Sequence, residues 1–290
     1  MKILVTGANG QLGTDLAARL DKSGAGVVAL DREGLDVSDA RAVARVVGSS
    51  KPDAIINCAA YTKVDLAQTE RDKAFSVNRD GPANLADAAK DAGAQLYHIS
   101  TDFVFDGKKS SPYNEDDEAA PLSVYGESKL GGEIEIARRM SEYAIIRTSW
   151  LYGASGSNFV KTILKLASER ERLTVVYDQV GAPTSTADLS EAIIALMKKR
   201  FDGNAPSGVY HFANEGVASW YDFAVAILNE ARSRGLSLNC RSIEPILSKD
   251  YPTSARRPAY SVLDKTKIKK ACGLVIPHWT ASLKNMMDAL

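Results

Sequence analysis

Cysteine is scarce in this sequence. Its 290 residues include three cysteines, Cys58, Cys240 and Cys272, which are widely spaced and form no Cys-x-x-Cys pair. An odd number of scattered cysteines argues against a disulfide framework and against a structural zinc site. We therefore expect reduced thiols in a cytoplasmic protein.

Long apolar runs and an excess of one charge are also missing. No stretch reaches the ~18 apolar residues that a membrane span needs, and the start, MKILVTGANG, has too short an apolar run for a signal peptide. Lys plus Arg equals Asp plus Glu, at 36 each, so no global field attracts nucleic acid or an anionic membrane. We predict no nucleic-acid partner and no membrane partner.

The first half of the chain alternates apolar, β-rich runs with helical patterns. Strands are expected at 3–5, 27–30, 54–57, 95–100 and 143–148, with helices from the first glycine loop to about residue 20 and at 38–47, 80–91 and 122–140. Continuous apolar strands alternating with helices are typical of a parallel sheet covered on both faces. The pattern predicts an α/β fold with a doubly wound, Rossmann-type parallel sheet.

The second half has a looser pattern. Helices are expected at 158–169, 186–199, 220–234 and 281–288, separated by loops rich in Gly, Pro and Ser. We predict a dinucleotide-binding domain at 1–150, rejoined by about 175–200, and a smaller, interleaved substrate-binding cap made mainly of 151–290.

A glycine loop follows the first strand. In TGANGQLG, Gly7, Gly10 and Gly13 stand three residues apart, between a strand and a helix. Glycine permits a tight turn and close approach of the backbone to a pyrophosphate, and the helix N-terminus supplies amide donors. A simple turn before a helix would also explain the spacing, but the context favours dinucleotide binding.

Asp31 ends the second predicted strand, 18 residues beyond Gly13. An acidic residue there can bind the ribose hydroxyls of the adenosine, whereas the adjacent Arg32 could meet a 2′-phosphate. A solvated carboxylate at a strand end is the alternative interpretation of Asp31. The choice between NADH and NADPH stays open.

Candidate catalytic residues lie where later strands end. Thr101 follows the fourth strand, and Tyr125 and Lys129 stand one helical turn apart in VYGESKLGGE. Such a group can reduce a carbonyl, since a hydride acceptor needs a proton donor and hydrogen-bond donors. A phenol has a pKa near ~10, and we expect the lysine ammonium to lower it. By itself, the Tyr-Lys pair could equally be an exposed helix pair.

Several motifs together resemble one family. TGANGQLG, NCAAYT, STDFVFDG, PLSVYGESKLGGE, RTSWLYG, DQVGAPTST and PTSARRP follow one another as in the extended short-chain dehydrogenases/reductases. Within these, nearly the whole chain is similar to the dTDP-4-dehydrorhamnose reductases. The resemblance implies that NAD(P)H delivers hydride to C4 of dTDP-4-dehydro-6-deoxy-L-mannose, giving dTDP-L-rhamnose.

The resemblance also implies roles for single residues. Tyr125 would donate the proton, with Lys129 as its cofactor-binding partner and Thr101 as the third catalytic residue. Asn78 would be the superfamily's helix asparagine near the site. The expected cofactor-binding residues are Gly7, Gly10, Gln11, Leu12, Gly13, Asp31, Arg32, Asp36, Val37, Ala60, Tyr61, Thr62, Tyr125 and Lys129, and the expected substrate-binding residues are Thr101, Asp102, Phe103, Trp150 and Arg257.

Two of these assignments have plain alternatives. Arg257 suits a diphosphate, because guanidinium groups bind phosphate bidentately, but it could be an exposed loop arginine. Trp150 could belong to the core between the two domains.

Some family members bind magnesium through acidic residues at a dimer interface. Asp15 occupies one such position, but the second position reads Ala187. We predict no metal and regard a homodimer as an open alternative.

Related functions compete with reduction. A nucleotide-sugar dehydratase or epimerase would share the glycine loop and the Tyr-Lys pair, but a dehydratase needs Glu directly after Thr-Asp, where this chain has Phe103. A non-catalytic subunit such as the beta subunit of methionine adenosyltransferase would bind dinucleotide without needing the reaction. The presence of Thr101, Tyr125 and Lys129 favours the enzyme.

Overall fold

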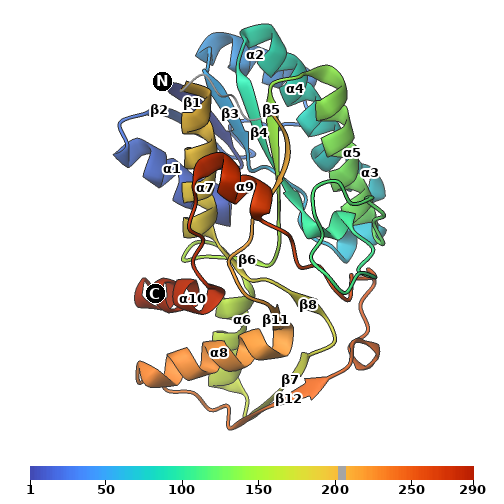
Figure 1. Ribbon diagram of the computed structural model, residues 1–290, viewed down its shortest axis with the longest axis vertical. Coiled ribbons are helices and arrows are strands. Elements are labelled where there is room, and N and C mark those ends of the chain that lie inside the picture. The colour runs from blue at the N-terminus through green and yellow to red at the C-terminus, as the bar shows by residue number, and fades with distance from the viewer. Residues whose placement is uncertain (202–206) are drawn as a thin grey trace.

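A six-stranded sheet forms the centre of the protein (Figure 1). The computed structural model describes residues 1–201 and 207–290. The strand order is β10-β5-β4-β3-β1-β2, and every neighbouring pair is parallel. The strands are β1 (Lys2–Thr6), β2 (Gly26–Leu30), β3 (Ala54–Asn57), β4 (Gln95–Thr101), β5 (Tyr143–Thr148) and β10 (Gly208–His211). The predicted α/β fold with a doubly wound parallel sheet is confirmed.

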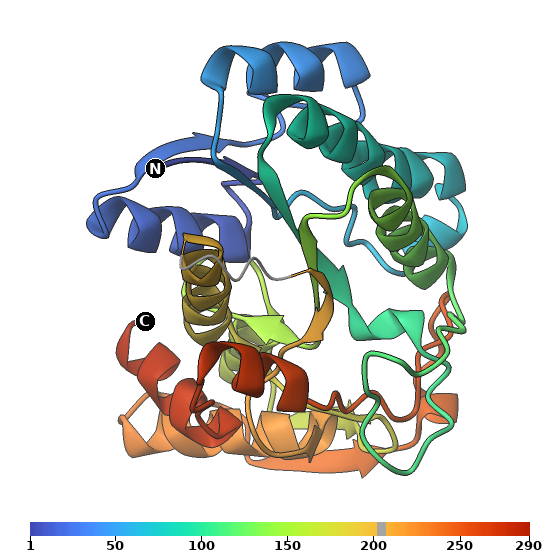
Figure 2. The ribbon, with the colours of Figure 1, turned by 45° about the horizontal axis from the view of Figure 1, so that its top comes forward.

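Helices cover both faces of this sheet (Figure 2). On one face lie α1 (Gln11–Lys22), α7 (Thr186–Phe201) and α9 (Thr266–Cys272), and on the other lie α2 (Ala40–Ser50), α4 (Gly81–Ala92) and α5 (Val124–Arg139). Successive side chains of a strand point to opposite faces, so Ile3 packs with Leu16 on one side while Leu4 packs with Leu85 on the other. This double burial explains the continuous apolar strands of the sequence.

A smaller part of the chain packs below the sheet in the view of Figure 1. Its helices are α6 (Phe159–Glu169), α8 (Trp220–Ser233) and α10 (Trp279–Asp288), and its strands pair as β7 (Arg172–Val176) with β12 (Ser242–Ile246), β8 (Val180–Gly181) with β11 (Ala218–Ser219), and β6 (Leu151–Tyr152) with β9 (Thr184–Ser185). Phe223, Tyr152, Trp279 and Leu283 belong to its own buried core.

Some elements were not predicted from the sequence. The four-residue strand β10 pairs with β5 and extends the sheet, and α3 (Arg71–Phe75) with a π-turn at Ser76–Asp80 precedes α4. Helix α7 packs with α1 on the sheet, although it lies well beyond residue 150. The division into a domain at 1–150 and a cap at 151–290 stays a prediction.

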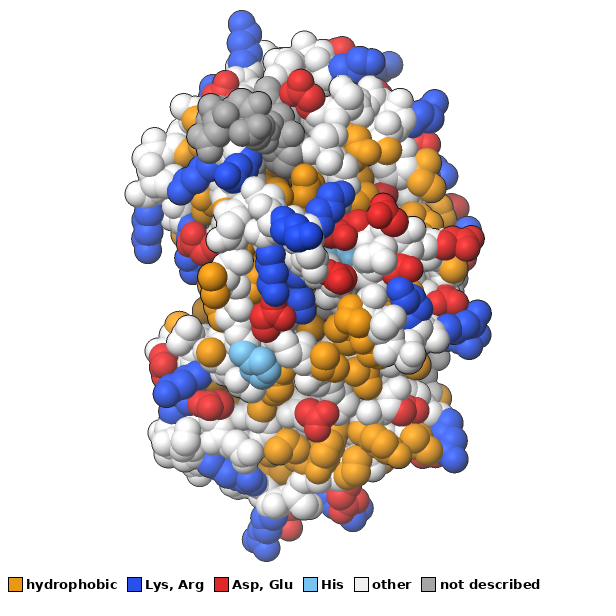
Figure 3. Space-filling model, viewed as in Figure 1, with side chains coloured by type: hydrophobic (Ala, Val, Ile, Leu, Met, Phe, Trp, Pro, Cys, Tyr) orange, Lys and Arg blue, Asp and Glu red, His pale blue; other side chains and the backbone are white. Residues whose placement is uncertain are grey.

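Charges of both signs are mixed on the visible surface (Figure 3). This matches the equal totals of acidic and basic residues. Among the described residues, no helix combines the length and apolarity needed to cross a membrane.

A buried ion pair ties α5 to the sheet. Arg147 of β5 donates from its Nη2 atom to Glu133 Oε2 at 2.7 Å, and the two side chains are only 6% and 5% exposed. Ser100 of β4 donates to the same carboxylate. The pair therefore joins α5, β4 and β5 directly behind the carboxyl ends of the strands.

We predict that Glu133→Gln lowers the free energy of unfolding by ~3–5 kcal/mol, because it leaves the Arg147 charge buried without its carboxylate. Urea unfolding measures this change. Glu244→Gln is the matched control, since Glu244 pairs with Arg172 on the surface, with side chains 49% and 67% exposed. We expect that loss to stay below ~1 kcal/mol, and equal losses in the two variants would contradict the account.

Candidate active site

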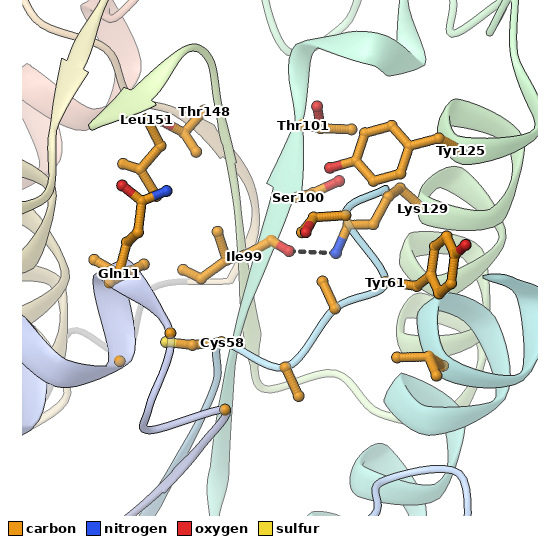
Figure 4. A pocket seen from close by; sticks show the side chains of 18 of the residues that line it. Gln11, Cys58, Tyr61, Ile99, Ser100, Thr101, Tyr125, Lys129, Thr148 and Leu151 are labelled. Carbon is orange, nitrogen blue, oxygen red and sulfur yellow. Dashed lines mark hydrogen bonds between the residues drawn. The ribbon is translucent and has the colours of Figure 1, made fainter. Parts of the chain in front are cut away.

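A cleft of about 590 Å³ opens at the carboxyl ends of the central strands. It lies where the strand order reverses, between β1 and β3, which is the usual ligand site of an open α/β sheet. Figure 4 shows Gln11 of α1 on one wall and Tyr125 and Lys129 of α5 on the other, with Ile99, Ser100 and Thr101 of β4 between them.

The glycine loop forms the wall next to α1. Gly7 has φ +65°, and a Cβ atom there would lie 2.6 Å from the backbone nitrogen of Ala59. A Cβ atom on Gly13 would clash with the carbonyl oxygen of Gly7. Gly10 is the N-cap of α1, and no side chain caps this helix end. Its first amide groups can therefore serve a bound phosphate.

Arg32 and Asp36 line one end of the cleft, but Asp31 does not. The Oδ1 atom of Asp31 accepts hydrogen bonds from the amides of Glu33 and Gly34, at 3.0 Å each, so this carboxylate caps a turn beside the cleft. The Arg32 guanidinium is exposed and 3.6 Å from the Asp36 carboxylate. At this end a basic group faces the cleft more directly than Asp31 does.

The structure brings Tyr125, Lys129 and Thr101 together in this cleft. Burial raises the pKa of Tyr125 to about 12, against the effect of a hydrogen bond with Thr101. This direction is opposite to the sequence-based expectation that Lys129 lowers the pKa. The reason is geometric, because the Lys129 Nζ atom turns to the carbonyl oxygen of Ile99, at 2.6 Å (Figure 4). At neutral pH the phenol therefore keeps its proton.

Asp102 is buried at the same strand end, with 2% of its surface exposed. Its Oδ1 atom accepts a hydrogen bond from the Thr101 hydroxyl at 3.1 Å, and the Ser261 side chain also lies near enough to favour the carboxylate. Among the residues described, Oδ2 makes no hydrogen bond of good geometry. Burial raises its pKa to about 6. Phe103 meets the Tyr125 ring edge-on, with centroids 5.5 Å apart, and carries no group that could take a proton.

The predicted substrate residues Trp150 and Arg257 have different positions. Trp150 lines the cleft and stacks on Trp220 with ring centroids 3.6 Å apart, so it also packs against the smaller core. Arg257 is not among the lining residues. Its Nη2 atom donates to Asp65 Oδ2 at 2.7 Å.

Asn78 lies behind the cleft and holds a loop that lines it. Its Oδ1 atom accepts from the amide of Tyr61 at 2.8 Å, and its Nδ2 atom donates to the Tyr61 carbonyl and to Ser128 of α5, both at 3.0 Å. Asn78 thus fixes the Ala60–Thr62 loop, which carries three predicted cofactor residues, to the helix of Tyr125.

Asp15, the residue considered for a metal, is already paired. Its Oδ1 atom accepts from Arg19 at 2.9 Å, and Arg19 also contacts Glu191 at 2.7 Å. In the ranges that the structure covers, no group of three or more His, Cys, Asp or Glu side chains could hold a metal ion.

Sequence reasoning missed several lining residues. Cys58, Thr148, Ser149 and Leu151 follow β3 and β5 and could have been found by the rule that strand ends gather the ligand. Gly156 and Ser157 come from the loop before α6, for which the sequence offered no signal. The remaining predicted site residues line the cleft: Gly7, Gly10, Gln11, Leu12, Gly13, Val37, Ala60, Tyr61 and Thr62.

Comparison with known proteins agrees with this geometry. The family described as RmlD substrate binding domain matches residues 1–290. The dTDP-4-dehydrorhamnose reductase of Aggregatibacter actinomycetemcomitans is 45% identical over 287 residues, which cover 98% of each chain. The chain belongs to the dTDP-4-dehydrorhamnose reductase family. The resemblance seen in the motifs is therefore confirmed, and the chain is an NAD(P)H-dependent oxidoreductase rather than a non-catalytic subunit.

Two further relatives extend this comparison. The spore coat polysaccharide biosynthesis protein SpsK of Bacillus subtilis (strain 168) is 43% identical, covering 99% of this chain and 97% of its own. The crystal structure of the family's reductase from Bacillus anthracis str. Ames in complex with NADP has a TM-score of 0.92 and 37% identity, covering 100% of this chain and 99% of that one.

The pKa of Asp102 leads to a prediction about stability. Its pKa in the folded protein is about 6, above the ordinary 3.8, so the group stabilises the fold at low pH, and this contribution disappears as the pH rises through about 6. Asp102→Asn removes that dependence. Between pH 4.5 and 7.5, the variant should gain about 2 kcal/mol of unfolding free energy relative to the unsubstituted protein. Urea unfolding without ligand measures this, and an equal difference at both pH values would contradict it.

Proposed function

We propose that this chain uses NADPH or NADH to reduce the C4 ketone of dTDP-4-dehydro-6-deoxy-L-mannose to dTDP-L-rhamnose. The observation that carries the proposal is the position of the Tyr125 phenol, which shares one cleft with Thr101, Lys129 and the glycine loop. The names of the relatives support the substrate, and the NADP complex of the Bacillus anthracis protein supports the cofactor.

The residues present fit a dinucleotide. The close packing of Gly7 against Ala59 lets a pyrophosphate approach the backbone, and the amides at the start of α1 face its charge. Arg32 and Asp36 would meet the adenosine ribose and a 2′-phosphate if one is present. In this proposal residues 1–150, rejoined by the α7 region, hold the dinucleotide, and the rest of the chain caps the sugar.

Side chains of this protein then supply the proton. When bound, the reduced nicotinamide supplies the hydride. Tyr125 gives its proton to the sugar oxygen as negative charge develops there, since a phenol with a pKa of about 12 is fully protonated at neutral pH. Thr101 orients the reacting oxygen, and Asp102 accepts a sugar hydroxyl through its unpartnered Oδ2 atom. Trp150 borders the sugar.

Arg257 remains the proposed partner of the nucleotide diphosphate. In this role the guanidinium leaves the Asp65 carboxylate and binds the ligand. A bidentate arginine–phosphate contact can offset the loss of that ion pair. The homodimer and the cytoplasmic location stay predictions.

Dehydration fits this site poorly. A dehydratase of this superfamily abstracts a proton next to the carbonyl with a Glu directly after Thr-Asp, and here Phe103 occupies that position against the Tyr125 ring. A sister reductase acting on an isomeric nucleotide 4-keto sugar is the second candidate, favoured by the similarity to SpsK.

The proposed function is tested by mixing the purified protein with dTDP-4-dehydro-6-deoxy-L-mannose and either NADPH or NADH. We expect absorbance of the reduced nicotinamide to fall, with dTDP-L-rhamnose as the product. Turnover of an isomeric 4-keto sugar alone would support the sister reductase. No oxidation with any such sugar, while dinucleotide still binds, would contradict the proposal.

Tyr125→Phe is the matched variant for this assay. It removes one hydroxyl from a partly buried ring and should lower turnover by ~10²–10⁴-fold, the usual contribution of a general acid, while dinucleotide affinity stays nearly unchanged. Near-normal turnover in this variant would remove Tyr125 from its role as proton donor.

A further inference from the structure

His98 is a fully buried histidine in the middle of β4. Both of its ring nitrogens have side-chain partners. Nδ1 lies 2.9 Å from Asn57 Nδ2, and Nε2 lies 3.2 Å from the Lys129 Nζ atom. The imidazole therefore joins the end of β3 to the lysine of the cleft.

Asn57 determines which ring nitrogen carries the proton. Its Oδ1 atom accepts from the backbone amide of Ala59 at 3.1 Å and from the Thr6 hydroxyl at 2.7 Å. A backbone amide can only donate, so the oxygen of Asn57 must face Ala59 and its NH₂ group must face His98. Nδ1 of His98 is then the acceptor, and the single proton of the neutral ring resides on Nε2.

This tautomer points an N–H group at Lys129. An ammonium group has three donors and no lone pair, so it cannot accept from Nε2–H, whereas a neutral amine can. The Lys129 Nζ atom also donates to the carbonyl oxygen of Ile99 at 2.6 Å. A neutral amine thus matches both neighbours, and an ammonium matches only Ile99.

We propose that His98, locked as the Nε2–H tautomer by Asn57, is a positioning residue that favours the neutral amine of Lys129 over the ammonium in the ligand-free cleft. In alkaline solution, where the neutral amine predominates, Lys129 takes up one proton from solvent when the hydroxyl groups of a bound dinucleotide supply new acceptors. The second statement rests on the proposed function, because it takes the ligand to be a dinucleotide.

The other groups around Lys129 are compatible with this assignment. Glu133 on the same helix favours the ammonium form of Lys129, but its carboxylate is already paired with Arg147. Burial raises the pKa of the Cys58 thiol to about 12 and that of Tyr125 to about 12, so both stay neutral. Burial lowers the pKa of Lys129 to about 8, and burial also holds the pKa of His98 well below its usual range.

The first test is NMR of the ligand-free protein. Only three histidines are present, so His98 can be assigned with His98→Gln. We expect its ¹⁵N shifts to report the Nε2–H tautomer and no titration between pH 5 and 9, while Lys129 titrates near pH 8. An Nδ1–H tautomer, or a Lys129 midpoint near the usual ~10.4, would overturn the proposal.

The second test measures proton uptake on binding of NADP⁺ at pH 9, by calorimetry in buffers of different ionisation enthalpy. A group with a pKa of about 8 is about nine-tenths deprotonated at this pH, so the unsubstituted protein should take up close to one proton. In Asn57→Asp the carboxylate accepts from Nδ1–H of His98, so Nε2 becomes an acceptor for the ammonium, and the uptake should fall by more than half.

His278→Gln is the matched control, since His278 is exposed and caps α10. It should take up as many protons as the unsubstituted protein. Binding of NADP⁺ without uptake, or an uptake that Asn57→Asp leaves unchanged, would overturn the proposal. Absence of NADP⁺ binding would instead contradict the proposed function, and the NMR titration would still decide the charge of Lys129.

Discussion

Burial of ionisable side chains at the carboxyl edge of the sheet is the constraint on which the site depends. Lys129 and Asp102 are buried and Tyr125 is partly buried where β4 ends and α5 begins. Desolvation disfavours the charged form of any such group. Burial accordingly shifts each of the three pKa values in the direction that favours the neutral side chain, and Tyr125, with a pKa of about 12, keeps its proton at neutral pH.

This burial requires a rigid wall behind the cleft. The Glu133–Arg147 pair joins α5 to β5, and Ser100 joins the same carboxylate to β4. Asn78 connects α5 to the Ala60–Thr62 loop, and Asn57 with His98 connects β3 to Lys129. Buried polar side chains at the ends of β3, β4 and β5 thus fix α5 and the Ala60–Thr62 loop to the sheet.

Much of this could be predicted from the sequence. Five of the six strands of the central sheet followed from apolar runs, because strands buried on both faces keep a simple pattern. The glycine loop and the Tyr125–Lys129 spacing predicted which residues would meet in the cleft. Strand β10 was missed because its sequence, GVYH, is no continuous apolar run, and its place in the sheet depends on pairing with β5.

The remaining features depend on contacts between distant residues. Arg257 pairs with Asp65, 192 positions away, and Trp150 stacks on Trp220, so neither environment can be read from local pattern. The direction of the Tyr125 pKa depends on how completely the ring is covered and on Lys129 reaching Ile99 rather than the phenol. The motif identifies Tyr125 and Lys129, but it does not show how far the fold shields these two side chains from solvent.

The central claim is that the ligand-free cleft holds Tyr125 as a protonated acid. The most direct measurement is a pH titration of ¹³C-labelled tyrosine by NMR, with the Tyr125 resonance assigned by its absence in a Tyr125 variant. The account predicts no tyrosinate signal from Tyr125 up to about pH 10, since its pKa is about 12. A tyrosinate midpoint below the ordinary ~10 of a free phenol would contradict it and would mean that Lys129, not burial, controls the phenol.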